Sequence, residues 1–280
     1  MVKLKELRKK SIETLKGCQN DSPLADVDYI LSHLGFSKTD LLLGEKGVDP
    51  STEDTFYRYL ERLKSGEPVQ YITGKCEFMS LDFEVDTHTL IPRSDTEILV
   101  EAVIETAKNI PKPNILEVGC GSGCIAISLA HYIPDARVTS IDISDGALAV
   151  ARRNAVANSV AERIEFKKHN VFDGFDFCKT APDIIVSNPP YIPKADVLTL
   201  DKKVKDFEPL TALDGGDDGL DFYKFIARNC KLSQNGILAF EVGINQAQDV
   251  AKIMSERFCD IKIIPDLAGI ERVVVGWIKQ

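Results

Sequence analysis

The sequence predicts an α/β protein in which a parallel β-sheet is covered by helices on both faces and is preceded by a small bundle of helices. From residue 94 onward, short apolar segments alternate with helical segments, a pattern typical of such sheets. Residues 1–66 show helical periodicity instead. The chain of 280 residues is 44% hydrophobic and 28% charged, which is typical of a globular protein with one or two domains.

The N-terminal region is expected to form four short helices, each with apolar residues on one face. Ser37 with Asp40 is expected to cap the third helix, and Ser51 with Asp54 the fourth. No cluster of chemically reactive side chains accompanies these helices. We therefore interpret them as a structural bundle.

Residues 68–91 change in character from helical to strand-like. Short strands are expected at residues 71–72, 77–78 and 81–85, with a turn at Ser80. Three parts of the chain are therefore predicted: a helical bundle domain at 1–74, a hairpin-containing linker at 75–92 and an α/β domain at 93–280.

The α/β domain is expected to alternate between helices and strands along its length. In chain order we expect a helix at 95–108, a strand at 114–118, a helix at 123–133, a strand at 137–141, a helix at 145–158, strands at 164–167 and 183–187, a helix at 222–230, a strand at 236–241, a helix at 246–257 and a final pair of strands at 261–264 and 272–277. This alternation predicts a sheet whose strands are mainly parallel.

The charge of the chain is uneven, and its sign limits the possible partners. The net charge is −9; residues 1–75 carry 12 basic and 12 acidic side chains, whereas residues 76–280 carry 22 and 31. Duplex DNA is bound mainly through Lys and Arg that neutralise phosphates, so an acidic chain disfavours direct nucleic-acid binding. The acidic region instead favours a basic protein partner.

The seven cysteines and the first residues of the chain indicate a cytoplasmic protein. The cysteines show no Cys-x-x-Cys spacing and no nearby His, so we expect reduced thiols and no metal site. The N-terminal segment MVKLKELRKK contains no apolar run, so we expect no signal peptide. No stretch approaches the roughly 18 apolar residues of a membrane span, so we expect no contact with a membrane.

A glycine-rich turn follows the apolar segment 114–118. Gly119, Gly121 and Gly123 permit a tight turn and let a ligand approach the backbone. The dinucleotide fingerprint would need Gly or Ala where this chain has Cys124, and no Lys follows as in a P-loop. The turn therefore carries no strong signal for a phosphate group.

Asp142 ends the next predicted strand, 19 residues after Gly123. A carboxylate at this place can accept hydrogen bonds from ribose hydroxyls and disfavours a 2′-phosphate. Both features suit an adenosine-containing cofactor without phosphates, and S-adenosyl-L-methionine is such a compound. The alternative interpretation is that the glycines only form a tight turn and that Asp142 caps a helix.

The segment Asn188-Pro189-Pro190-Tyr191 follows the predicted strand at 183–187. Prolines end a strand and stiffen its exit, and ligands of open α/β sheets bind at this end of the strands. The Asn188 amide oxygen and a backbone carbonyl beside proline can hold an NH₂ group by its two hydrogens, next to the flat surface of Tyr191. Such a grip directs the nitrogen lone pair of a weak nucleophile toward an electrophile. The alternative is a rigid turn without a ligand.

Taken together, these motifs resemble the release-factor glutamine methyltransferase family (PrmC/HemK) of the class I S-adenosylmethionine-dependent methyltransferases. The resemblance extends along most of the chain, through the segments QYITGKCEF, LIPRSDTEILVE, EVGCGSGCIAI, SNPPYIP, FEPLTALDGGDDGLDFY and DLAGIERVVVGW. It implies a Rossmann-like seven-stranded sheet with one antiparallel strand and a small N-terminal helical domain. It also implies that residues 93–280 are the methyltransferase domain.

The resemblance implies roles for individual residues. Asn188, with Pro189, Pro190 and Tyr191, would form the catalytic slot for the target amide, and Asn188 would also lie beside the cofactor. Asp142 would bind the cofactor's ribose. The rest of the implied cofactor site consists of residues near its methionine and adenine ends: Glu117, Gly119, Cys120, Gly121, Ser122, Gly123, Asn170, Val171 and Phe172. Asn170 stands where members of the family often carry an acid.

The implied function is methylation of the glutamine in the Gly-Gly-Gln motif of peptide-chain release factors, which would be the protein partners. The nearest alternative is the related enzyme that methylates a glutamine of a ribosomal protein. A nucleic-acid adenine-N6 methyltransferase shares the Asn-Pro-Pro-Tyr motif, but the acidic charge disfavours it. A third alternative is a cofactor-binding scaffold without catalysis.

Overall fold

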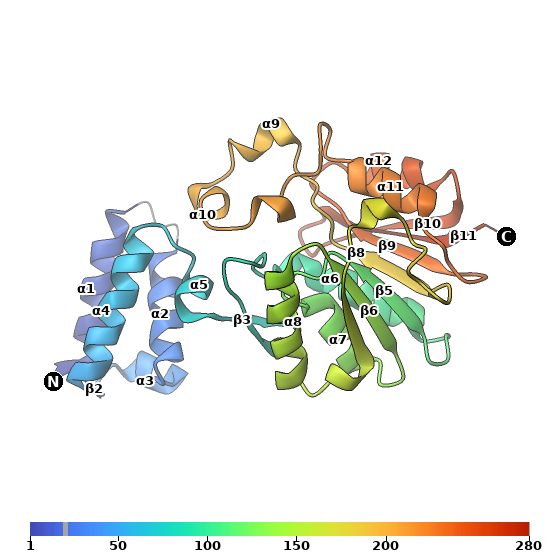
Figure 1. Ribbon diagram of the computed structural model, residues 1–280. Coiled ribbons are helices and arrows are strands. Elements are labelled where there is room, and N and C mark those ends of the chain that lie inside the picture. The colour runs from blue at the N-terminus through green and yellow to red at the C-terminus, as the bar shows by residue number, and fades with distance from the viewer. Residues whose placement is uncertain (19–21, 280) are drawn as a thin grey trace. The chain divides into compact units, whose positions relative to one another are not determined.

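The computed structural model describes residues 1–18 and 22–279, which fall into two compact units (Figure 1). The first unit comprises Met1–Lys75 and Lys202–Phe207, and the second comprises Cys76–Asp201 and Glu208–Gln280. Within the described part of the chain, no helix has both the length and the apolar character needed to cross a membrane.

The first unit is built mainly of helices. They are α1 (Leu4–Lys16), α2 (Pro23–His33), α3 (Lys38–Leu43), α4 (Pro50–Lys64), α5 (Val69–Thr73) and α10 (Lys202–Lys205), with a short antiparallel pair of strands, β1 (Val2–Lys3) and β2 (Gly47–Val48). Buried aliphatic and Phe side chains of α1, α2, α4 and α5 form one core. The helices predicted for residues 1–66 are all present, and Ser37 and Asp40 form the expected capping box at α3.

The predicted start of α4 is wrong. The cap is Asp49, whose carboxylate accepts hydrogen bonds from the N–H groups of Ser51 and Thr52, each at 3.0 Å. Pro50 occupies the first helical position, so Ser51 already lies inside the helix. An Asp followed by Pro is a stronger helix start than Ser51 with Asp54, because Asp satisfies the free N–H groups and Pro needs no acceptor there.

The short strand predicted at residues 71–72 is also wrong, because these residues lie in α5. Val69 and Ile72, three residues apart and so on one helical face, both pack into the core of the first unit. Gly74 ends the helix in the left-handed conformation with φ 70°. Packing against the bundle thus overrides the β-propensity of the Tyr-Ile pair.

A mostly parallel sheet forms the centre of the second unit. Its strands are β5 (Asn114–Val118), β6 (Arg137–Asp142), β7 (Ile164–Lys168), β8 (Ile184–Ser187), β9 (Ile237–Glu241), β10 (Phe258–Pro265) and β11 (Glu271–Ile278). Among the described residues the sheet has seven strands in the order β10-β11-β9-β8-β5-β6-β7. β11 runs antiparallel to β9 and β10, and the other neighbours are parallel. This confirms the expected Rossmann-like sheet.

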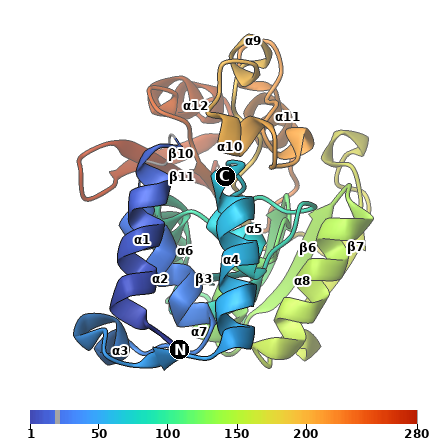
Figure 2. The same cartoon turned by 90° about the vertical axis from the view of Figure 1, so that its left-hand side faces the viewer.

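Helices cover both faces of the sheet (Figure 1 and Figure 2). One face carries α6 (Ser94–Ala107), α7 (Cys124–Tyr132) and α8 (Asp145–Ala157), and the other carries α11 (Asp221–Asn229) and α12 (Ala247–Met254). Successive residues of a strand face opposite layers, so Ile115 packs in one core cluster and Leu116 in the other. Every residue of β8 is buried, as expected for a strand covered on both sides.

Two segments outside the sheet bear on the site. The predicted hairpin is formed by β3 (Lys75–Phe78) and β4 (Leu81–Glu84). Met79 and Ser80 at its tip have φ values of 50° and 57°, which suit a two-residue hairpin turn. After β8, the chain forms α9 (Lys194–Val197) and a 3₁₀ turn at Leu210–Ala212, neither of which was predicted.

Asn154 of α8 joins two segments that are distant in the sequence. Its side chain is fully buried, and its Nδ2 donates to the backbone oxygens of Glu84 and Ser122, both at 2.9 Å. Its Oδ1 accepts from the N–H of Glu84 at 2.7 Å. One side chain therefore holds both the hairpin and the glycine loop after β5 against α8.

Asn154→Ala should destabilise the protein by about 3 kcal/mol, because backbone groups of Glu84 and Ser122 lose their partners at roughly 1–3 kcal/mol each. Urea unfolding measures this loss. Asn158→Ala is the matched control, since the Asn158 Nδ2 donates to the exposed backbone oxygen of Asp82 and to the Asn154 backbone oxygen, both at 3.0 Å, and the latter keeps its helical N–H donor. The control should cost about 0.5 kcal/mol. Equal losses in the two variants would contradict the role given to Asn154.

Candidate active site

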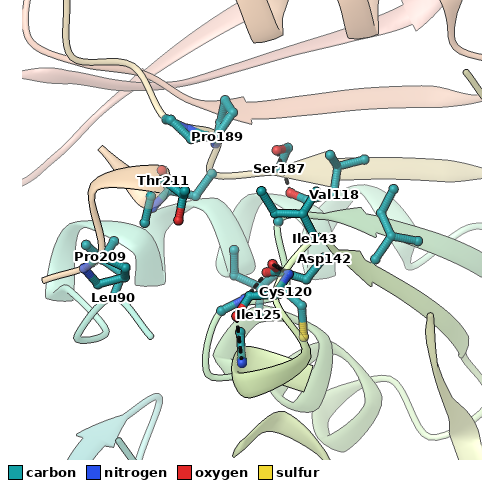
Figure 3. A pocket seen from close by; sticks show the side chains of 18 of the residues that line it. Leu90, Val118, Cys120, Ile125, Asp142, Ile143, Ser187, Pro189, Pro209 and Thr211 are labelled. Atoms are coloured by element: carbon teal, nitrogen blue, oxygen red, sulfur yellow. Dashed lines mark hydrogen bonds between the residues drawn. The ribbon is translucent and has the colours of Figure 1, made fainter. Parts of the chain in front are cut away.

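A cavity of about 300 Å³ lies at the carboxyl ends of three central strands (Figure 3). Val118, Asp142 and Ser187, the last residues of β5, β6 and β8, all line it. In Figure 3, Leu90 and Pro209 lie together on one side of the view, away from Val118 and Asp142. Ligands of open α/β sheets bind at this end of the strands, so the cavity is the candidate active site.

The glycine loop forms one wall of the cavity in a backbone conformation that other residues rarely adopt. Gly119, Gly121 and Gly123 have φ values of 85°, 53° and 82°. A Cβ on Gly123 would lie 3.0 Å from the Cβ of Ala151, so this glycine also allows α7 and α8 to pack closely. The N–H of Gly119 donates to the Ile141 oxygen at 3.0 Å, which ties the loop to β6.

The Asp142 carboxylate lies between this loop and the start of α8. Its Oδ2 accepts from the N–H of Gly121 and its Oδ1 from the N–H of Ser144, each at 2.9 Å. An ionised carboxylate offers about four acceptor sites, so it can accept further hydrogen bonds from a ligand. Because Asp142 lines the cavity, those acceptors are available to a bound sugar.

Glu117 lies in β5 but does not line the cavity. Its side chain is fully buried and accepts a hydrogen bond from the Ser140 hydroxyl, while its Oε1 has no hydrogen-bond partner among the described residues. Burial raises the pKa of Glu117 to about 8. The carboxyl therefore carries a proton over much of the neutral range.

The Asn-Pro-Pro-Tyr segment forms the wall next to the glycine loop. Asn188, Pro189 and Pro190 line the cavity, and a Cβ on Gly119 would lie 3.7 Å from the Asn188 backbone oxygen. The Asn188 Nδ2 donates to the Thr96 hydroxyl at 3.2 Å. The two sequence motifs thus meet at one site.

Tyr191 is not part of the lining, unlike the residues before it. Its ring packs at the edge of the core that includes α12, and burial raises the pKa of its hydroxyl to about 12. Its backbone oxygen accepts from the Gln246 side chain at 2.9 Å. Tyr191 therefore supports the exit from β8 from outside the cavity.

Part of the cavity lining forms an apolar slot. Its lining includes Ile143, Val171, Phe172 and Phe222, and the rings of Phe172 and Phe222 lie 4.9 Å apart. The Asn170 side chain also lines it, and its Oδ1 accepts from the N–H of Phe172 at 3.1 Å. A flat heterocycle fits such a slot, with polar groups of Asn170 at its edge.

Sequence reasoning missed a further group of residues that line the cavity. They come from the segment before α6, from its first turn and from the chain after β8: His88, Leu90, Pro92, Arg93, Thr96, Pro209, Thr211 and Ala212. Arg93 pairs with Glu208, whose side chain is buried and whose pKa burial raises. The segments LIPRSDTEILVE and FEPLTALDGGDDGLDFY are part of the family resemblance, but no local pattern in them indicates contact with the cavity.

Glu117, Gly123 and Tyr191 thus lie behind the cavity wall, whereas the other candidate residues line it. Among the described residues, no group of three or more His, Cys, Asp or Glu side chains is arranged to hold a metal ion. The cavity combines an acidic ribose-type site, an apolar slot and an uncharged amide beside a glycine loop.

Comparisons with known proteins match both units of the chain. The model of the Methyltransferase small domain matches residues 94–203, and that of the PrmC N-terminal domain matches residues 6–74. The Release factor glutamine methyltransferase of Fusobacterium nucleatum is 40% identical over 273 residues, which cover 95% of this chain and 77% of that protein. The protein of the same name from Clostridium acetobutylicum is 36% identical over 281 residues, covering 98% of each chain. The crystal structure of a methyltransferase from Pyrococcus furiosus has a TM-score of 0.51 at 16% identity, covering 71% of this chain and 90% of that one, which shows likeness of fold.

Glu117→Gln should stabilise the ligand-free protein more and more as the pH rises from about 5 to about 8.5. The fold raises the pKa of Glu117 from its ordinary value of 4.5 to about 8, so unfolding releases a proton in this range and the parent protein loses stability as the pH rises. Glutamine cannot release this proton, so the variant does not lose stability in this way. Melting temperatures of variant and parent across this pH range measure the difference, and Glu101→Gln, at an exposed position, is the control. A difference in melting temperature that does not change with pH would contradict the assignment.

Proposed function

Because this chain belongs to the release factor glutamine methyltransferase family, we propose that it methylates the side-chain amide nitrogen of the glutamine in the Gly-Gly-Gln motif of peptide-chain release factors. S-adenosyl-L-methionine, whose sulfonium carries an electrophilic methyl group, is the methyl donor. The observation that carries the proposal is that the glycine loop, Asp142 and the Asn188-Pro189-Pro190 segment line one cavity.

The cavity fits this cofactor. We propose that the Asp142 carboxylate binds the two ribose hydroxyls, because it lines the cavity with acceptor sites to spare. The apolar slot formed by Val171, Phe172 and neighbouring side chains would hold the adenine, with Asn170 at its edge. Around the methionine end, the proposed binding residues are those of the loop: Gly119, Cys120, Gly121 and Ser122. Glu117 and Gly123 would act by supporting the loop, since they do not line the cavity.

The amide slot is proposed at Asn188 and Pro189. The Asn188 Oδ1 and the backbone carbonyl of Pro189 would accept one N–H each from the glutamine NH₂ group. An amide nitrogen is a weak nucleophile, so orientation and exclusion of water supply most of the rate enhancement. Pro190 and Tyr191 would keep this exit from the strand rigid, the latter from behind the wall.

The proposed domains are a helical bundle at residues 1–74, a hairpin-containing linker at 75–92 and a methyltransferase domain at 93–280. The family models that match residues 6–74 and 94–203 support this division. The proposed partner is a protein, and the net charge of −9 favours a basic surface on it. Release factors act in translation, so we propose the cytoplasm as the place of action, without direct contact to nucleic acid or membrane.

Asp142→Ala should weaken binding of S-adenosyl-L-methionine and of its demethylated product by about 2 kcal/mol, the order expected for losing charged hydrogen bonds. Isothermal titration calorimetry measures both affinities. Asp145→Ala is the control, because Asp145 lies three residues away and pairs with Lys168 on the surface at 2.5 Å. The parent protein should not bind NAD. Unchanged affinity in Asp142→Ala, or tight NAD binding, would contradict the proposed cofactor site.

The function is tested by offering labelled S-adenosyl-L-methionine with a purified release factor, the same factor with Gln→Ala in its Gly-Gly-Gln loop, ribosomal proteins and duplex DNA. Only the unaltered factor should be labelled. Asn188→Ala should lose roughly 100-fold or more in rate while keeping cofactor affinity, because orientation of the amide is lost. Asn158→Ala serves as a remote amide control.

Transfer to DNA, or equal transfer to the Gln→Ala factor, would overturn the proposed function. Transfer to a ribosomal protein alone would keep the chemistry and assign the other glutamine as substrate. An Asn188→Ala variant with normal activity would show that this residue only forms a turn.

A further inference from the structure

A buried carboxyl lies behind the proposed amide slot. Glu241 is the last residue of β9, the strand beside β8. The parallel register pairs Ser187 with Phe240, so the next residues, Asn188 and Glu241, lie at the same level along the two strands. A residue far away in the sequence is thereby a neighbour of the Asn-Pro-Pro-Tyr motif.

The Glu241 side chain is only 3% exposed, and the Thr96 hydroxyl and the Asn188 amide are close enough to it to lower its pKa as hydrogen-bonding neighbours. Its Oε2 has no hydrogen-bond partner among the described residues. Burial raises the pKa of Glu241 to about 7. When the carboxyl is protonated, the unpartnered Oε2 can carry the proton, and Oε1 remains an acceptor.

These contacts give the hydrogen bonds a direction. The Asn188 Nδ2 donates to the Thr96 oxygen at 3.2 Å, so the Thr96 proton is left to donate to Glu241. Both groups can then donate to the Glu241 carboxyl. The two ends of an Asn amide are nearly equal in size, so sterics alone do not choose between them. An acceptor behind the amide draws Nδ2 inward and leaves Oδ1 toward the cavity.

The backbone at Glu241 is held in place by the surrounding fold. The Tyr223 hydroxyl donates to the backbone oxygen of Glu241 at 2.9 Å. Arg272 of β11 is attractive to Glu241 but also pairs with Asp95 at 2.8 Å and with Asp266 at 3.1 Å. Its charge is therefore shared, and Glu241 remains free to accept from Thr96 and Asn188.

We propose that Glu241 is a positioning residue that, directly and through Thr96, holds the Asn188 amide with its oxygen facing the cavity. This inference rests on the proposed function, in which the slot receives the NH₂ group of a glutamine. If the Asn188 amide were turned the other way, its NH₂ group would face the NH₂ group of the substrate glutamine, and two donors cannot form a hydrogen bond. The same reversed amide would instead suit a carboxylate, so Glu241 would set the preference for glutamine over glutamate.

The test uses Glu241→Met, which removes the acceptor at similar volume, and the matched pair Thr96→Val and Thr96→Ser. The full-length variants are assayed with the release factor as substrate and with its Gln→Glu form as competitor. Glu241→Met and Thr96→Val should lower kcat about tenfold. They should also lower the preference for the glutamine form over the glutamate form by a similar factor, with cofactor affinity unchanged. Thr96→Ser, which keeps the hydroxyl, should restore both values to within about twofold of the parent.

The preference for the glutamine form over the glutamate form distinguishes a positioning role from general support of the fold. General damage to the fold would lower turnover without changing the ratio of the affinities for these two forms. The double variant Thr96→Val with Glu241→Met should lose less than the product of the single losses, as expected for members of one chain of hydrogen bonds. A parent-like preference in Thr96→Val would overturn the proposal, also where Glu241→Met fails to fold. Absence of any transfer by the parent protein would instead overturn the proposed function.

Discussion

The parallel register of four central strands is the constraint on which the site depends. Val118 pairs with Ile141 of β6 on one side and with Ser187 of β8 on the other, and Ser187 pairs with Phe240 of β9. Parallel strands end at one edge of the sheet, so the segments that follow them meet there. A slip of one residue would turn every side chain of a strand to the opposite face, so the register also decides which residues reach the cavity.

Two buried carboxyls near this edge of the sheet, those of Glu117 and Glu241, lower the stability of the folded protein. They are 0% and 3% exposed, each has an oxygen without a partner among the described residues, and burial raises the pKa of both. Apolar residues would fill these positions at less cost, because burying a polar group without full hydrogen bonding is unfavourable. Such costs concentrate at functional sites. Here Glu117 lies in β5, which leads into the glycine loop, and Glu241 ends the strand beside the one that leads to Asn188.

The chain after β8 is ordered by close contact with its own later segment. The N–H of Ile192 donates to the Leu213 oxygen at 3.0 Å, and the N–H of Gly215 donates to the Ile192 oxygen at 2.9 Å. A Cβ on Gly215 would lie 2.7 Å from the Tyr191 Cα, so a glycine is needed for this approach. The segment that supplies Pro209 and Thr211 to the cavity is thereby fixed to the Asn-Pro-Pro-Tyr exit. The segment FEPLTALDGGDDGLDFY thus has a structural role.

The sequence by itself determined the fold class, the order of helices and strands and the place of both motifs at strand ends, because periodicity, glycine spacing and prolines act locally. The predicted start of α4 was wrong because Asp49 caps the helix before Ser51. The strand predicted at 71–72 was wrong because these residues lie in a helix that packs against the bundle. Only the tertiary structure decided that Thr96 and Glu241 flank Asn188, and that Glu117 and Tyr191 lie behind the wall. Strand order and register bring distant residues together, and these depend on the packing of the whole sheet, which no local pattern in the chain contains.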